Sequence, residues 1–274
     1  MSKVKKDSLG DRMKTYEAVP KNYLTRRTPV IIRLDGCHAH SFTRGLRKPF
    51  DDVFIPSMQE TMKYLCENIQ GCVLGYTQSD EITLVLCDYK KLDTAAWFDN
   101  QVQKIVSVSA SMATFAFNKW FEFYVNGIVS ADISDIDDEL TDEERTDFDK
   151  YKSVLVKRAD QGLTFDSRCF NVPKEEVCNC LIWRQQDATR NSIEGLAQSM
   201  FSQKELQGVN CKALQDKMFT ERDVNWNDLP TRLKRGSCCV KNDSGKWFID
   251  TEIPVFTQDR EYIENRIVFS GDED

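Results

Sequence analysis

The sequence has no apolar run near the roughly 20 residues that a membrane-spanning helix needs. Its first residues, MSKVKKDSLGDRMK, include basic side chains, but no apolar segment of the kind found in secretory signals follows them. Internal repeats and low-complexity linkers are missing as well. We therefore expect a globular protein that has no membrane segment and stays in the cytosol.

Cysteine is present, but the spacing of a metal site or a disulfide framework is not. Of the ten cysteines, the tightest groups are Cys178 with Cys180 and Cys238 with Cys239. Neither group forms the CxxC unit with which two sulfurs bind one zinc ion. Reduced thiols are therefore expected. Histidine is scarcer still, since His38 and His40, in one loop, are the only two.

An excess of positive charge is also lacking. The net charge is −7 and the pI is near 5.1, so the surface is not coated with phosphate-binding cations. Much of the acidic excess comes from one stretch, ADISDIDDELTDEERTDFD, which runs from Ala131 to Asp149. We predict that this stretch is a solvated insertion with one or two helical turns. The rest is close to neutral, which is compatible with an RNA-binding face but does not demand one.

What is present is the pattern of an ordinary globular domain, with 41% hydrophobic and 30% charged residues in 274. The segment from Thr28 to Leu34 reads as a buried strand, and Val53 to Ile69 reads as an amphipathic helix. Gly71 to Asp88 reads as a hairpin with acidic residues at its turn, and Ala95 to Val125 as a long helix. This order begins a split βαβ, ferredoxin-like antiparallel sheet with packed helices, so we predict an α+β fold.

The remainder of the chain is harder to assign. Gly162 to Val172 and Cys178 to Trp183 look like further strands, and we expect the second to run into a helix. From about Phe201 the sequence is irregular and forms a C-terminal extension, with a hairpin-like stretch around Asn242 to Gly245.

Two acidic residues stand at strand ends. Asp35 ends the first strand and Asp80 lies at the hairpin turn, and these points are neighbours in such a sheet. Mg²⁺ takes oxygen ligands, often one or two carboxylates together with substrate phosphates, so the pair fits a magnesium site. Glu81 would point to the opposite face from Asp80 and would reach the metal only if the turn bends. The competing interpretation is plain, because Asp-Gly and Ser-Asp-Glu are also common turn sequences.

The loop after the first strand has the composition of a phosphate-binding loop. Gly36 lacks a side chain, so backbone groups there can approach a phosphate or a metal closely. Cationic groups that could neutralise a triphosphate follow it, namely His38, His40, Arg44, Arg47 and Lys48.

The motif RLDGCHAHSF, followed by KPFDD and then by YTQSDE, resembles the signature of the tRNA-His guanylyltransferase superfamily. Three further stretches, FDSRCFNVPKEEV, WRQQDATRNSI and FSQKELQGVN, agree with its Thg1-like branch. The resemblance runs from about Ser8 to Gly236 and is interrupted by the acidic stretch. It implies a nucleotidyltransferase with a polymerase-like palm. Residues 1–126 would form the catalytic core, 127–160 the acidic insertion, and 161–274 the rest of the core with an RNA-contacting region, in one catalytic unit.

The resemblance also implies site residues. Asp35, Asp80 and the carbonyl of Gly36 would hold two Mg²⁺ ions, and Glu81 is a further catalytic candidate. The nucleotide would be held by the side chains or backbone of Asp35, Gly36, Cys37, His38, Ala39, His40, Lys48, Ser79, Asp80 and Lys104, with the two lysines near triphosphate groups. The substrates would be ATP, GTP and tRNA, and the protein would be a homotetramer. Family chemistry activates an RNA 5′ end and extends it in the 3′ to 5′ direction.

One departure separates two activities. Guanylyltransferases that add the extra guanosine to tRNA-His carry His-Ile-Asn-Asn where this chain has Thr189-Arg190-Asn191-Ser192. This difference favours template-dependent repair of 5′-truncated tRNA over guanosine addition to tRNA-His. A nucleotide cyclase with a palm-like domain and a non-catalytic RNA-binding module are more distant alternatives.

Basic residues outside these motifs are weaker candidates for RNA contacts. Arg184 and Arg190 are candidates, although arginines on helices are more often solvated or salt-bridged. A small basic cluster beside Trp226, formed by Arg232, Lys234 and Arg235, is equally well explained as surface charge.

Overall fold

The protein is described here by a computed structural model that covers residues 8–130 and 141–269. A six-stranded antiparallel sheet forms its centre, in the order β4-β1-β3-β2-β5-β6. The strands are β1 (Val30–Gly36), β2 (Cys72–Gln78), β3 (Glu81–Leu86), β4 (Phe165–Asn171), β5 (Ser237–Lys241) and β6 (Trp247–Asp250). The first four strands have the order expected of a ferredoxin-like sheet, so the predicted α+β fold is confirmed.

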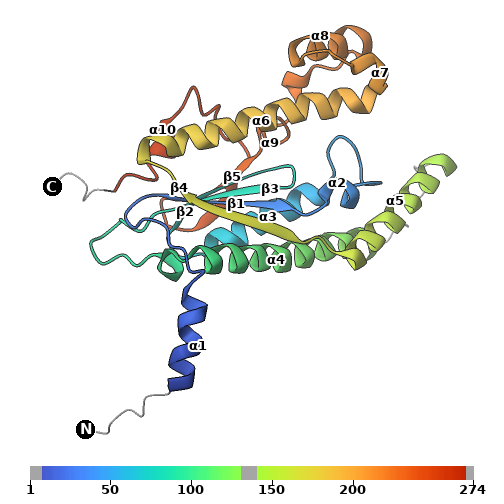
Figure 1. Ribbon diagram of the computed structural model, residues 1–274. Helices are drawn as coiled ribbons and strands as arrows, with labels where there is room; N and C mark the ends of the chain where they lie inside the picture. Colours follow the sequence, from blue (N-terminus) through green and yellow to red (C-terminus); the bar gives the residue numbers. More distant parts are fainter. Residues whose placement is uncertain (1–7, 131–140, 270–274) are drawn as a thin grey trace.

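Helices cover both faces of the sheet (Figure 1). The longer ones are α1 (Ser8–Ala18), α3 (Phe54–Asn68), α4 (Val102–Ser130), α5 (Asp142–Gln161), α6 (Lys174–Met200) and α8 (Cys211–Arg222). The short ones are α2 (Ala39–Phe42), α7 (Gln203–Leu206), α9 (Thr231–Arg235) and α10 (Glu261–Glu264), with 3₁₀ turns at Trp97–Asn100 and Trp226–Asp228. No helix in the described part of the chain is long and apolar enough to cross a bilayer.

Alternation along β1 divides the core between the two faces. Ile32 and Leu34 pack in one cluster with residues of α3 and α4, whereas Ile31 packs in a second cluster with Leu181 of α6. Successive side chains of a strand point to opposite faces, so Arg33 and Asp35 share the α6 face with Ile31. The polar end of β1 therefore lies under α6.

The expected strand from Cys178 to Trp183 is wrong, because this segment lies inside α6. A short apolar run alone does not distinguish a strand from a buried helix. The buried residues of α6 decide the matter, since Val177, Leu181, Arg184 and Ala188 recur at gaps of three or four residues. They form the helix face that covers the sheet.

The acidic region differs from the expectation of a solvated insertion with one or two turns. Residues 131–140 lie outside the described residues. After them, Thr141 and Glu144 form a reciprocal capping box that begins α5, a helix of 20 residues. Tyr151 and Leu155 of α5 are buried, so the middle of the helix packs against the protein.

Candidate active site

The end of β1 and the β2–β3 turn lie side by side, as expected. The Gly36 amide donates a hydrogen bond of 3.0 Å to the Asp80 carbonyl. A Cβ atom placed on Gly36 would lie 3.4 Å from the Asp80 Cβ and 3.2 Å from the Ala39 Cβ. Asp35 precedes Gly36, so the structure brings together all three groups that were predicted to hold metal.

The turn that presents Asp80 has only two residues. Gln78 pairs with Glu81 across the ladder, which leaves Ser79 and Asp80 as the connection. Ser79 has a positive φ of 49°, as hairpins of this length require. Its hydroxyl donates a hydrogen bond of 2.9 Å to Asp80 Oδ1, which orients the carboxylate.

Asp35 is surrounded by other carboxylates, and their negative charges outweigh the positive charge near it. In the strand ladders Asp35 lies opposite Glu81 on one side and Asp166 on the other. Burial, and then the charges of Asp80, Glu81 and Asp166, raise the pKa of Asp35, and Arg168 opposes them. A divalent cation would relieve this repulsion. The oxygen donors of Asp35, Asp80 and the Gly36 carbonyl therefore fit a hard ion such as Mg²⁺.

Glu81 does not join Asp35 and Asp80. Arg184 Nε donates to Glu81 Oε1 at 2.7 Å, and Arg33 Nη2 lies 3.4 Å from Oε2. Within residues 8–130 and 141–269, no three His, Cys, Asp or Glu side chains are gathered so that they could hold a metal. The expectation that Glu81 acts with the two aspartates is therefore wrong in this geometry. Its buried carboxylate is an ion-pair partner of α6.

The same ion pairs remove Arg184 from the candidates for RNA contact. Its side chain is 6% exposed, and Nη2 donates to Asp187 at 2.8 Å. Asp187 also pairs with Arg190, whose side chain remains 58% exposed. The sequence predicts solvated or salt-bridged arginines at these positions, but it does not identify Glu81 as the partner of Arg184. The contact between Arg184 and Glu81 joins residues distant in sequence, so no local sequence pattern predicts it.

The loop after Gly36 turns back at once onto the core. The Cys37 amide donates to the Thr164 carbonyl at 2.8 Å, and the buried Ala39 begins the short helix α2. His38 has a left-handed backbone conformation with φ of 58°. Both His38 and His40 are exposed.

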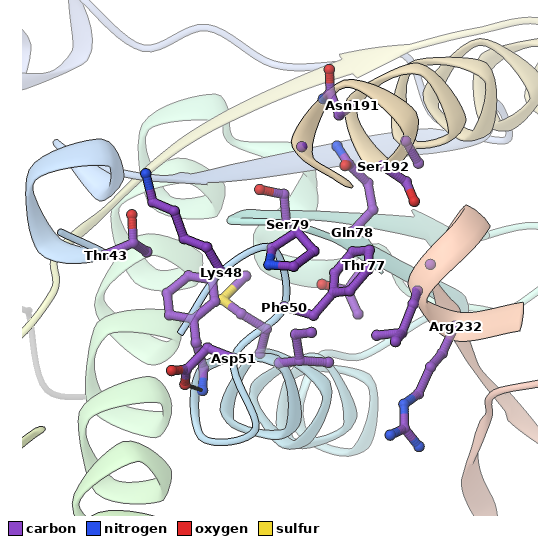
Figure 2. A pocket seen from close by; sticks show the side chains of 18 of the residues that line it. Thr43, Lys48, Phe50, Asp51, Thr77, Gln78, Ser79, Asn191, Ser192 and Arg232 are labelled. Carbon is purple, nitrogen blue, oxygen red and sulfur yellow. Dashed lines mark hydrogen bonds between the residues drawn. The ribbon is translucent and has the colours of Figure 1, made fainter. Parts of the chain in front are cut away.

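A cavity of about 300 Å³ opens next to Ser79 (Figure 2). Lys48 and Asp51 lie on one side of it, and Arg232 of α9 lies on the other. Asn191 and Ser192 of α6 complete the polar wall. The structure thus places Ser79 and Lys48, both predicted nucleotide contacts, on one cavity. Its floor is apolar, with Phe54, Ile55 and Met58 of α3.

Lys104 is not brought to this site within the chain. It lies in the first turn of α4, where its ammonium group sits 5.6 Å from the centre of the Phe98 ring. Thr114 of the same helix accepts a hydrogen bond from the Phe165 amide, and Phe165 is paired with Gly36. Ten helical residues, about 15 Å, separate Lys104 from that level.

The basic cluster near Trp226 is divided. Lys234 donates to the Asn227 carbonyl and lies 5.9 Å from the centre of the Trp226 ring, so it is held against its own loop. Arg232 instead borders the cavity.

Comparison with known proteins agrees with this geometry. A family model described as tRNAHis guanylyltransferase (Thg1) matches residues 10–173. A bacterial tRNA(His) guanylyltransferase (Thg1)-like protein in complex with ATP is similar, with a TM-score of 0.79 and 43% identity over 96% of this chain and 100% of the other. A bacterial Thg1-like protein in complex with GTP gives a TM-score of 0.74 and 39% identity, with the same coverage.

A curated relative extends the comparison to eukaryotes. The probable tRNA(His) guanylyltransferase of Dictyostelium discoideum is 26% identical over 77% of this chain and 75% of its own length. From the family model and these likenesses, the chain belongs to the Thg1 family of tRNA(His) guanylyltransferases, which are nucleotidyltransferases.

Proposed function

We propose that this enzyme adds nucleotides to the 5′ end of tRNA in the 3′ to 5′ direction, on a template, and so repairs 5′-truncated tRNA. The observation that carries the proposal is the convergence of Asp35, Gly36 and Asp80 at one sheet edge beside a cavity. Similar Thg1-like proteins have been solved in complex with ATP and with GTP, which supports these nucleotides as substrates. The Thr-Arg-Asn-Ser sequence at 189–192 favours repair over guanosine addition to tRNA-His.

In this proposal the side chains divide the work. Asp35, Asp80 and the Gly36 carbonyl hold two Mg²⁺ ions, which supply charge neutralisation at the phosphates and lower the pKa of the attacking hydroxyl. Ser79 keeps Asp80 oriented through its 2.9 Å hydrogen bond. Lys48 and Arg232, on opposite sides of the cavity, balance triphosphate charge. His38 and His40 lie on the exposed side of the same edge.

The test is extension of a labelled tRNA that lacks its first nucleotide, with Mg²⁺, ATP and GTP. Asp80→Ala should abolish addition, because one of the two metal-binding carboxylates is lost, while the melting temperature stays near that of the wild type. Full activity of this variant would refute the metal assignment. A metal titration of both proteins, with Mn²⁺ followed by its paramagnetic signal, gives a second readout that does not depend on the reaction.

Guanosine addition to tRNA-His remains the second candidate, because the matching family model is described by that activity. The two are separated by comparing intact tRNA-His, which needs an extra guanosine, with tRNAs that need a templated first nucleotide. A cyclic nucleotide formed from GTP alone would instead indicate a cyclase.

We further propose that the enzyme is a cytosolic homotetramer, as the family resemblance implies, and light scattering tests the assembly. Residues 1–126 and 161–274 would act as one catalytic unit. This is supported by the sheet, because β4 lies next to β1 and β5 next to β2.

A further inference from the structure

One wall of the cavity is a loop held from behind by the carboxylate of Asp51. We call residues 44–51 the pocket loop. Asp51 is buried, and its Oδ1 accepts hydrogen bonds from the amides of Val53 at 2.9 Å and Phe54 at 2.8 Å. Its Oδ2 accepts from the Arg47 amide at 2.9 Å and from the Tyr151 hydroxyl at 2.8 Å. Asp51 therefore ties the pocket loop both to α3 and to α5.

Helix α5 makes two further contacts with the pocket loop. The guanidinium of Arg47 lies 4.5 Å from the centre of the Tyr151 ring. One helical turn beyond Val154, Arg158 Nη2 donates to the Arg44 carbonyl at 2.7 Å. These contacts come from one face of the helix, since residues three and four apart are neighbours on its surface.

The packing between helix and loop is also tight. Gly45 has φ of +92°, which favours glycine. A Cβ atom there would lie 3.2 Å from Val154 Cγ1. The backbone of the loop therefore runs directly against α5, and a shift of the helix would move the loop.

We propose that Tyr151 is a positioning residue for the nucleotide, acting through Asp51 to hold the pocket loop in the shape that the nucleotide fills. Tyr151 acts on two residues of the pocket loop that line the cavity, through its hydrogen bond to Asp51 and its ring contact with Arg47. Lys48 lies between these two in the sequence and also lines the cavity, so we expect the position of its backbone to depend on the same contacts. The inference rests on the proposed function, because it takes the cavity as the nucleotide site.

The hydroxyl is suited to this role over the working pH range. Burial, and then the charge of Asp51 and the hydrogen bond to it, raise the pKa of Tyr151, and Arg47 opposes them. The side chain thus remains a neutral donor to Asp51. The charge of Asp52, which follows the pocket loop, also raises the pKa of Tyr151.

The test is calorimetric titration of ATP and of GTP, with Mg²⁺, into Tyr151→Phe, which removes only the hydroxyl. We expect binding about three- to tenfold weaker, because part of one hydrogen bond to a carboxylate is transmitted to the ligand. Tyr16→Phe, the same change at an exposed tyrosine of α1, is the matched control and should bind as the wild type does. Arg158→Gln removes the hydrogen bond from α5 to the Arg44 carbonyl and should also weaken nucleotide binding.

Two readouts separate positioning from general destabilisation. KM for the nucleotide should rise in Tyr151→Phe while kcat at saturation and the affinity for tRNA stay near the wild-type values. In a double-mutant cycle with Asp51→Asn, the losses of nucleotide affinity should not add, because both variants disturb the same contact between Tyr151 and Asp51. Wild-type binding by Tyr151→Phe would overturn the positioning role and leave the proposed function standing. Absence of nucleotide binding by the wild-type protein would overturn both.

Discussion

Replacing Arg184 with methionine should reveal how much the buried ion pair with Glu81 matters. The side chains of Arg184 and Glu81 are 6% and 8% exposed, and their closest atoms lie 2.7 Å apart. Removing one partner of a buried pair typically costs 3–5 kcal/mol, because the other charge stays buried and uncompensated. Arg33 remains 3.4 Å from Glu81. We therefore expect Arg184→Met to lower the free energy of unfolding by an amount at the lower end of this range, about 3 kcal/mol.

This loss is measurable in two ways. A fall in stability of about 3 kcal/mol should lower the melting temperature by about 6–12 °C in a domain of this size. In urea the unfolding midpoint should fall while its slope stays constant, since the folded surface is unchanged. Arg190→Met is the matched control, because its pair with Asp187 is 58% exposed on the arginine side and surface pairs contribute about 0–1 kcal/mol.

The double variant Arg184→Met with Glu81→Met tests whether the lost stability comes from an unpaired buried charge. Two apolar side chains leave no buried charge at the pair itself, so the double variant should recover much of the stability lost in Arg184→Met. A loss below about 1 kcal/mol in Arg184→Met would refute the reasoning. So would a double variant that is less stable than either single one.

Two further predictions concern Asp35 and Lys104. In metal-free protein, Asp35→Asn should be more stable than the wild type at pH 7, because the raised pKa of Asp35 means that its charged form opposes folding. The Asp35 penalty grows as the pH rises from the ordinary value of 3.8 through the raised one, so the difference in melting temperature should narrow as the pH falls toward 3.8. Lys104→Ala should bind ATP as the wild type does in calorimetry, because Lys104 packs on Phe98 away from the cavity. Weaker ATP binding by this variant would show that Lys104 does contact the nucleotide.

The parts of the site that could be predicted are those encoded by local pattern. Asp35 ends a β-branched run and Asp80 sits in a two-residue turn, and the antiparallel order of strands then makes them neighbours. The helical period of α3 and the hairpin before α4 were equally legible. Cys178 to Trp183 was misread because an apolar run of that length fits either a strand or a helix.

What could not be predicted are the contacts between distant segments. Glu81 was a catalytic candidate, but its carboxylate pairs with Arg184 of α6, which lies 103 residues later in the chain. Tyr151 follows a strongly acidic stretch, which gave no sign that a buried tyrosine would reach Asp51. Such pairings depend on tertiary packing, and sequence periodicity carries no information about them.

The position of β1 between β3 and β4 has a consequence for biosynthesis. One ladder of β1 is supplied by the nearby hairpin, but the other is supplied by Phe165–Asn171, which leaves the ribosome much later. Until then the strand that carries Asp35 has an open side, with amides and carbonyls available to other chains. The part of the sheet that contains β1 should therefore complete its folding only after β4 has emerged, and its open edge needs protection until then.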